Sequence, residues 1–239
     1  GNGGVHAIKP QTGETVWSFS VAKRAVNTGV VIKGNTVFMS HGDENFDTVE
    51  MGLIAAFDGS ESGTISTRKW STTGVKFRTS SPVLDGDRLY QIDGGGTLHS
   101  FDTETGQEYW TQRLGNAQQA PLVMGDGKLY AGTNGGSFFI IRPHADRAEV
   151  LSQVTLPLST NSCCGSEGTP EQIVSGAAIS NGRVFFVSSD AVYAIGPKVA
   201  KTTKGLAVNE KVSPGEDPPT YLQVTPTELT LLPGEQVEL

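Results

Sequence analysis

The sequence lacks long hydrophobic runs, and it carries fewer basic than acidic residues. No stretch approaches the roughly 20 apolar residues that a membrane-spanning helix needs, so we predict no membrane span. The 18 lysines and arginines are scattered and stand against 25 aspartates and glutamates, which gives a formal net charge of −7. A protein that binds a nucleic-acid backbone needs a basic stripe. The charge balance therefore argues against nucleic acid as a partner.

Residues that would form a common catalytic or zinc centre are also scarce. The chain has only two cysteines, and a tetrahedral zinc site takes four ligands. No serine lies in the strand-to-helix turn of a nucleophile elbow. The histidines, which show no metal-pair spacing, are His6, His41, His99 and His144. His6 and His99 occupy equivalent positions in a repeat, which favours a packing role. We therefore predict no catalytic residues.

Glycine, by contrast, is abundant, and glycine-containing turns separate short apolar runs in a recurring order. The chain has 30 glycines, and 36% of its residues are hydrophobic. Each copy of the pattern joins a short apolar run, a turn with Gly or Asn, and a second apolar run. The copies are residues 30–39, 82–91, 121–131 and 177–186. Such turns between short runs predict antiparallel strands joined by tight hairpins.

A second motif falls between these copies and ends in tryptophan. It reads TGETVW at residues 12–17 and TGQEYW at residues 105–110, with a looser version from Ser62 to Trp70. Trp70 and Trp110 are about 40 residues apart, which is the spacing of one four-stranded propeller blade. We therefore predict an all-β fold, a β-propeller of four-stranded antiparallel blades.

The blades can be assigned along the chain. The best-defined blade spans residues 81–113, with a preceding blade at 29–70 and a following one at 120–156. Residues 5–19 supply only the outer half of a blade, and residues 173–195 only its inner three strands. About four blades are thus present, with open edges that invite pairing. We expect the chain to be part of a larger ring, completed by a missing N-terminal half or by a protein partner.

The strand order resembles the pyrroloquinoline-quinone (PQQ)-type propeller repeat over about residues 3–196. The resemblance rests on residues 5–8 followed by 12–17, and on 98–102 followed by 105–110. In that family the motif tryptophan docks one blade against the next. The docking residues that the resemblance implies are Trp17, Trp70, Trp110, Gly13 and Gly106. The same repeat serves quinoprotein dehydrogenases, a lipoprotein scaffold of outer-membrane barrel assembly and secreted bacterial proteins, so it implies a fold rather than one function.

The composition changes after residue 196, since half of the twelve prolines lie beyond it. We predict a partial propeller at 1–196, a Pro-rich linker at 197–220, and a segment at 221–239 that resembles the first strands of a bacterial immunoglobulin-like domain. Two strands cannot bury a sandwich core. Either the domain has been cut away, or these strands pack onto the propeller. They could also mediate self-assembly.

Cys163 and Cys164 are adjacent in a polar loop before an inner strand. In PQQ-dependent alcohol dehydrogenases an adjacent cysteine pair in the same kind of loop forms a ring disulfide against the cofactor. The resemblance therefore makes this pair a candidate PQQ contact, although the family's tryptophan floor, acidic base and calcium-ligating carboxylates are not found in this sequence. The alternatives are a disulfide that stiffens the loop, two reduced thiols, or metal or redox chemistry. An oxidised pair would imply an extracytoplasmic compartment.

An acidic segment after His41 offers oxygen ligands at alternate positions, as a calcium loop does. The candidate ligands are Asp43, Asn45, Asp47 and Glu50. The glycine and the bidentate glutamate of a standard calcium loop are absent, because Thr48 and Ile54 occupy those positions. The alternative is a solvated acidic loop without metal.

These observations lead to three functional hypotheses. The first is a non-catalytic, cofactor-free propeller of a secreted or cell-envelope bacterial protein that binds proteins or polymers. The second is part of a quinoprotein dehydrogenase that carries PQQ and calcium. The third is a subunit of an extracellular assembly joined through residues 221–239. The residues that line the central channel of the propeller ring should distinguish an enzyme from a scaffold.

Overall fold

The computed structural model describes residues 3–160 and 167–196, all of which belong to the first of two units of the chain, residues 1–197. The described residues form strands, turns and loops without a helix, and no helix among them could cross a membrane. Cys163 and Cys164, the predicted linker and the predicted terminal strands lie outside the described residues.

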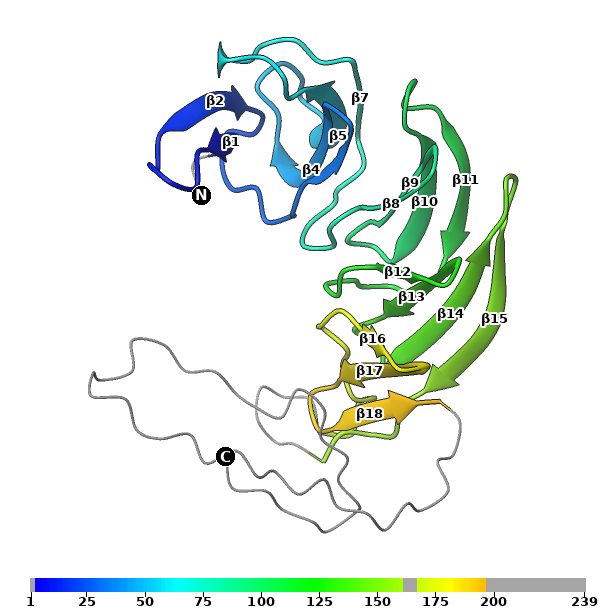
Figure 1. The fold of residues 1–239 in the computed structure, drawn as a ribbon. Coiled ribbons are helices and arrows are strands. Elements are labelled where there is room, and N and C mark those ends of the chain that lie inside the picture. The colour runs from blue at the N-terminus through cyan, green and yellow to red at the C-terminus, as the bar shows by residue number, and fades with distance from the viewer. Residues whose placement is uncertain (1–2, 161–166, 197–239) are drawn as a thin grey trace, which may run out of the picture. The chain divides into compact units, whose positions relative to one another are not determined.

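The strands are arranged in five sheets that follow one another along the chain (Figure 1). The first contains β1 (Gly4–Ile8), β2 (Thr15–Ser20) and β6 (Gly63–Thr64). The second contains β3 (Val31–Lys33), β4 (Thr36–Glu44), β5 (Met51–Asp58) and β7 (Trp70–Thr73). The third contains β8 (Val83–Asp85), β9 (Arg88–Ile92), β10 (Thr97–Asp102) and β11 (Glu108–Arg113). The fourth contains β12 (Val123–Gly125), β13 (Lys128–Gly132), β14 (Ser137–Pro143) and β15 (Ala148–Thr155). The fifth contains β16 (Ala178–Ser180), β17 (Arg183–Val187) and β18 (Val192–Ile195).

The second, third and fourth sheets are four-stranded antiparallel meanders, as the repeat predicted. The first contributes only an outer hairpin plus β6, and the fifth only three strands. The predicted fold class, a partial β-propeller of four-stranded blades, is confirmed.

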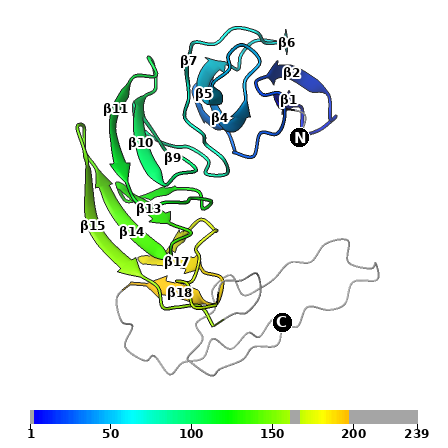
Figure 2. The same cartoon turned by 180° about the vertical axis from the view of Figure 1, so that it is seen from behind.

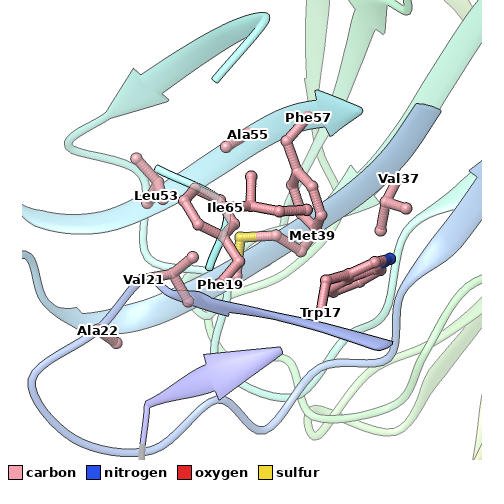
Figure 3. Close-up of a cluster of buried hydrophobic side chains, with 10 residues drawn as sticks. All are labelled: Trp17, Phe19, Val21, Ala22, Val37, Met39, Leu53, Ala55, Phe57 and Ile65. Carbon is pink, nitrogen blue, oxygen red and sulfur yellow. The ribbon is translucent and has the colours of Figure 1, made fainter. Parts of the chain in front are cut away.

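Apolar side chains fill the spaces between successive sheets. Figure 3 shows one such cluster, in which Trp17 and Phe19 of β2 meet Phe57 of β5 and residues of β4. The rings of Trp17 and Phe57 meet edge to face, with centroids 5.4 Å apart. Burying one such side chain contributes about 1.5–3 kcal/mol. The same face-to-face packing joins each later pair of sheets and fixes one blade against the next.

Each tryptophan of the second motif also donates a hydrogen bond into the next sheet. The Trp17 Nε1 atom donates to the carbonyl of Gly59 at 2.9 Å, Trp70 Nε1 to Thr103 at 2.9 Å, and Trp110 Nε1 to His144 at 3.0 Å. These carbonyls all lie in the connection between the third and fourth strands of the following blade. The indoles therefore connect the blades at that end, with the polar N–H satisfied and the ring buried.

Gly106 makes room for one of these indoles. Its φ is +71°, and a Cβ atom there would lie 2.4 Å from Cε3 of Trp70. Gly13 occupies the matching turn of the first sheet with a φ of +74°, and a Cβ atom added there would have no other atom within 4 Å. The close approach of backbone to indole thus requires glycine at residue 106.

The segment from Ser62 to Trp70 differs from the looser turn motif expected there. Residues of β6 pair in parallel with β2, Trp17 opposite Gly63 and Ser18 opposite Thr64 (Figure 2). The connection between β5 and β7 is longer than its counterpart between β10 and β11, so it reaches the neighbouring sheet. The buried side chain of Ile65 anchors it in the first core cluster. This pairing covers the outer edge of β2.

Candidate functional site

The hairpins between second and third strands lie at the same end of the blades as the crossovers to the next blade. This follows from the antiparallel order, because a fourth strand ends where the third begins. We call it the crossover end, formed by residues 42–50, 74–82, 93–96, 114–122 and 133–136. The amide of Gly94 donates to the carbonyl of Lys76 at 2.8 Å, so a crossover here meets the hairpin of the next blade.

A cavity of about 360 Å³ opens between these two segments. It is lined by Gly74, Val75, Lys76, Arg78, Asp93, Gly94, Gly95 and His99. The crossover alternates in burial, with Phe77 fully buried and Lys76 and Arg78 exposed on either side of it. Anchoring of Phe77 between the second and third sheets therefore directs both cations away from the core.

The side chain of Arg78 passes between two glycines. A Cβ atom on Gly94 would lie 2.8 Å from Cδ of Arg78, and one on Gly42 would lie 3.2 Å from its Cγ. Within residues 3–160 and 167–196, neither Arg78 nor Lys76 has a side-chain hydrogen bond or an ion pair. Two positive charges at the cavity are thus available to a ligand.

His99 forms the inner wall of the cavity between two carboxylates. Its Nδ1 atom lies 2.5 Å from Oε1 of Glu108, and its Nε2 atom lies 3.4 Å from Oδ2 of Asp93. Burial opposes protonation, but the contacts with the two carboxylates outweigh it and raise the pKa of His99 above its ordinary value. The ring also stacks on Phe101 and meets the edge of Phe77. His99 therefore packs against aromatic core residues, as predicted, and also lines the cavity.

Asp93 is held by the backbone of its own turn. Its Oδ1 atom accepts hydrogen bonds from the amides of Gly95 at 2.9 Å and Thr97 at 2.8 Å. Burial would raise the pKa of this carboxyl, but the neighbouring His99 and the hydrogen bonds from these amides keep the pKa below its ordinary value. Asp93 is therefore an ionised structural group of the turn.

A second cavity, of about 390 Å³, lies at the corresponding place one blade further on. It is lined by Leu114, Gly115, Asn116, Ala117, Thr133, Asn134, Gly135 and Ser137. No lining residue is charged. Both cavities lie between a crossover and a hairpin of the next blade. The charged lining residues therefore distinguish the first cavity from the second.

The loop between β4 and β5 contacts Arg78 and Thr73 at the first cavity and exposes apolar side chains. Val49 is 100% exposed and Phe46 56% exposed at its tip. The buried Asn45 holds the loop, because its Nδ2 atom donates to the carbonyls of Glu50 at 2.7 Å and Gly52 at 3.0 Å. The carboxylate of Glu50 in turn accepts a hydrogen bond from Thr73, next to the cavity wall.

The predicted calcium ligands lie in this same loop. The Oδ1 atom of Asp43 accepts the amide of Glu44 at 2.8 Å, and Asp47 is paired with Arg68 at 2.9 Å. The Oδ1 atom of Asn45 is buried without a hydrogen-bond partner. Over the described part of the chain, no three His, Cys, Asp or Glu side chains are grouped as a metal site would need. The calcium site stays a prediction.

The sequence did not single out Lys76 and Arg78. The available signal was a pair of cations on either side of an aromatic residue immediately after a fourth strand. The predicted PQQ contacts, Cys163 and Cys164, lie outside the described residues, so that prediction remains open.

Comparison with known proteins gives relatives for the repeat. Residues 50–149 match the family described as outer membrane protein assembly factor BamB. The tetrathionate hydrolase of Acidithiobacillus ferrooxidans is 25% identical over 134 residues, which cover 49% of this chain and 26% of that protein. The chain thus spans about a quarter of the curated relative it matches.

Solved structures share the fold at low identity. BamB from Moraxella catarrhalis superposes with a TM-score of 0.57 at 14% identity, over 77% of this chain and 50% of that one. A chain of a mitotic checkpoint complex gives a TM-score of 0.60 at 12% identity, over 80% of this chain and 55% of that one. The computationally designed Ika4 protein gives 0.54 at 13% identity, over 77% of this chain and 99% of that one.

Proposed function

Because the described residues form a partial β-propeller of PQQ-like repeats, we propose that the chain is a non-catalytic protein-binding module of a cell-envelope or secreted bacterial protein. The observation that carries this proposal is the crossover end of the blades. There, unpaired cations and an exposed apolar loop are held on a rigid framework of packed sheets. Binding residues are commonly carried by loops on such a scaffold.

The family match supports the location and the class of partner. The matched family is described as an outer membrane protein assembly factor, which favours an extracytoplasmic scaffold that binds proteins. Propeller folds host unrelated activities, so this argument comes from the family and not from the fold.

An enzyme is the alternative that the match to a hydrolase favours. The repeat family also implies PQQ, a flat quinone that needs an aromatic-walled slot and nearby carboxylates to hold calcium. The residues that line these two cavities do not fit this group, because none of them is a Phe, Tyr or Trp and the first cavity supplies a single carboxylate. The proposal therefore includes no step through a quinone.

The test uses the full-length protein in its native host. Co-purification from the solubilised envelope, followed by reconstitution with each purified candidate, should yield a saturable one-to-one complex. A preparation that binds no protein but turns over a small substrate, or that yields extractable quinone, would overturn the proposal. Self-association measured by light scattering, and lost when residues 221–239 are deleted, would support the assembly hypothesis instead.

A further inference from the structure

We propose that the cavity between the β7–β8 crossover and the β9–β10 turn binds a carboxylate side chain of an extended acidic segment in the partner protein. An apolar residue of the same segment packs on Phe46 and Val49. This inference rests on the proposed function and specifies the site and the chemistry of the partner.

The first argument is charge. The chain carries a net charge of −7, yet Lys76 and Arg78 face one cavity without a counter-ion in the described region. Arg68, by contrast, is already paired with Asp47 at 2.9 Å. A guanidinium binds a carboxylate through two parallel hydrogen bonds, and a lysine adds a second charge. The cavity therefore selects a carboxylate.

The second argument is that the cavity's own carboxylate is engaged elsewhere. Asp93 accepts two backbone amides and faces His99, and the imidazole is also bound to Glu108. Asp93 forms no ion pair with Lys76 or Arg78 in the described region, so both cations are available to an incoming ligand. An ion pair between Asp93 and either cation would have neutralised part of the positive charge that a ligand needs.

The third argument is the apolar loop beside the cavity. Gly42, at the base of the loop, contacts the stem of Arg78, and Glu50 is bound to Thr73 at the other side. Phe46 and Val49 therefore extend from a segment that is fixed to the cavity wall at two points. Exposed apolar residues next to charged groups are typical anchors of protein interfaces. An anionic small molecule or a nucleic acid would leave them unused.

The experiment measures binding of the full chain to a fluorescein-labelled peptide in which glutamate alternates with leucine, by fluorescence anisotropy at low salt. A peptide with glutamine in place of each glutamate is the matched probe. The site variant is Lys76→Gln with Arg78→Gln. The control variant is Lys9→Gln with Arg147→Gln, which changes the net charge equally through cations at the opposite end of the blades.

We expect the glutamate peptide to bind saturably and the glutamine peptide to bind at least about tenfold more weakly. The site variant should weaken the glutamate peptide by about tenfold, which corresponds to about 1.4 kcal/mol. The control variant should bind within about twofold of the unchanged chain. Val49→Ser should also weaken binding, whereas Val16→Ser should not.

Equal affinity for both peptides, equal loss in both variants, or no saturable binding would overturn the inference. The comparison of the two peptides uses the unchanged protein, so a folding defect in a variant does not obscure that result. If the native partner binds the site variant as well as it binds the unchanged protein, the inference fails while the proposed function stands. If no native partner exists, the proposed function fails.

Discussion

The Nε1 atom of Trp70 donates a hydrogen bond of 2.9 Å to the backbone carbonyl of Thr103, in the hairpin of the following blade. The ring of Trp70 simultaneously lies against Gly106, three residues further along the same hairpin. One indole thus makes a directional contact and a packing contact with the next sheet. The equivalent bonds of Trp17 and Trp110 make this a repeated device for joining blades.

Replacing Gly106 by alanine should destabilise the propeller more than the same change at Gly13. Both glycines have positive φ, so each substitution costs about 1–2 kcal/mol of backbone strain. Only at residue 106 would the added methyl group collide with Trp70, which adds about 1–3 kcal/mol of overpacking. The free energy of unfolding of each variant, measured with urea, checks this difference. Equal losses in the free energy of unfolding at the two positions would show that the contact with the indole does not contribute to stability.

Asn45→Ala should loosen the β4–β5 loop and destabilise the fold. The buried amide donates to the carbonyls of Glu50 and Gly52, and its removal leaves both without this donor. The expected loss in the free energy of unfolding is about 1–3 kcal/mol. Amide hydrogen exchange should accelerate in residues 46–51. Val49→Ala, in the same loop but with a fully exposed side chain, serves as the control. Unchanged exchange in Asn45→Ala would contradict this account of the loop.

His99 should make stability depend on pH on the alkaline side of its ordinary pKa. Its pKa in the folded protein is raised above the ordinary value of 6.5 by Asp93 and Glu108, against the opposing effect of burial. A raised pKa means that the contribution to stability is complete below about pH 6.5 and is lost as pH rises through the folded-state value. Lys76 and Arg78 are the charged groups that line the cavity opposite His99.

Urea unfolding at a series of pH values tests this dependence. The free energy of unfolding of the unchanged chain should fall over the window above about pH 6.5, and His99→Gln should flatten that fall. His6→Gln is the matched control, since His6 holds the equivalent strand position but is exposed. A difference between the unchanged chain and His99→Gln that stays constant with pH would refute the role of the charged imidazole. The buried His41, whose pKa is lowered chiefly by burial, acts in the separate window below pH 6.5.

Much of the fold could be predicted from sequence because each strand boundary has a local cause. The blade predicted at residues 81–113 agrees with β8 to β11, which run from Val83 to Arg113. The tryptophan motif set the blade period. The parallel pairing of β6 with β2 could not be predicted in this way, because it joins segments far apart in sequence and depends on how the two sheets pack.

The candidate site was less predictable for the same reason. Lys76, Asp93 and His99 belong to a crossover, a turn and a strand, and only the packing of two blades brings them together. The predicted calcium ligands were near one another in sequence, but in the fold Asp47 is paired with Arg68. Local spacing identified strands, whereas the cavity depends on contacts between blades.

The most direct test of the account is site-specific photo-crosslinking in the full-length protein in its native host. A benzophenone amino acid at Val49 should crosslink to a protein partner, and the same group at the exposed Val16 should not. The adduct at Val49 should disappear when Lys76 and Arg78 are both changed to glutamine. Equal crosslinking from both positions, or none from Val49, would contradict the claim that this propeller binds a protein through its crossover end.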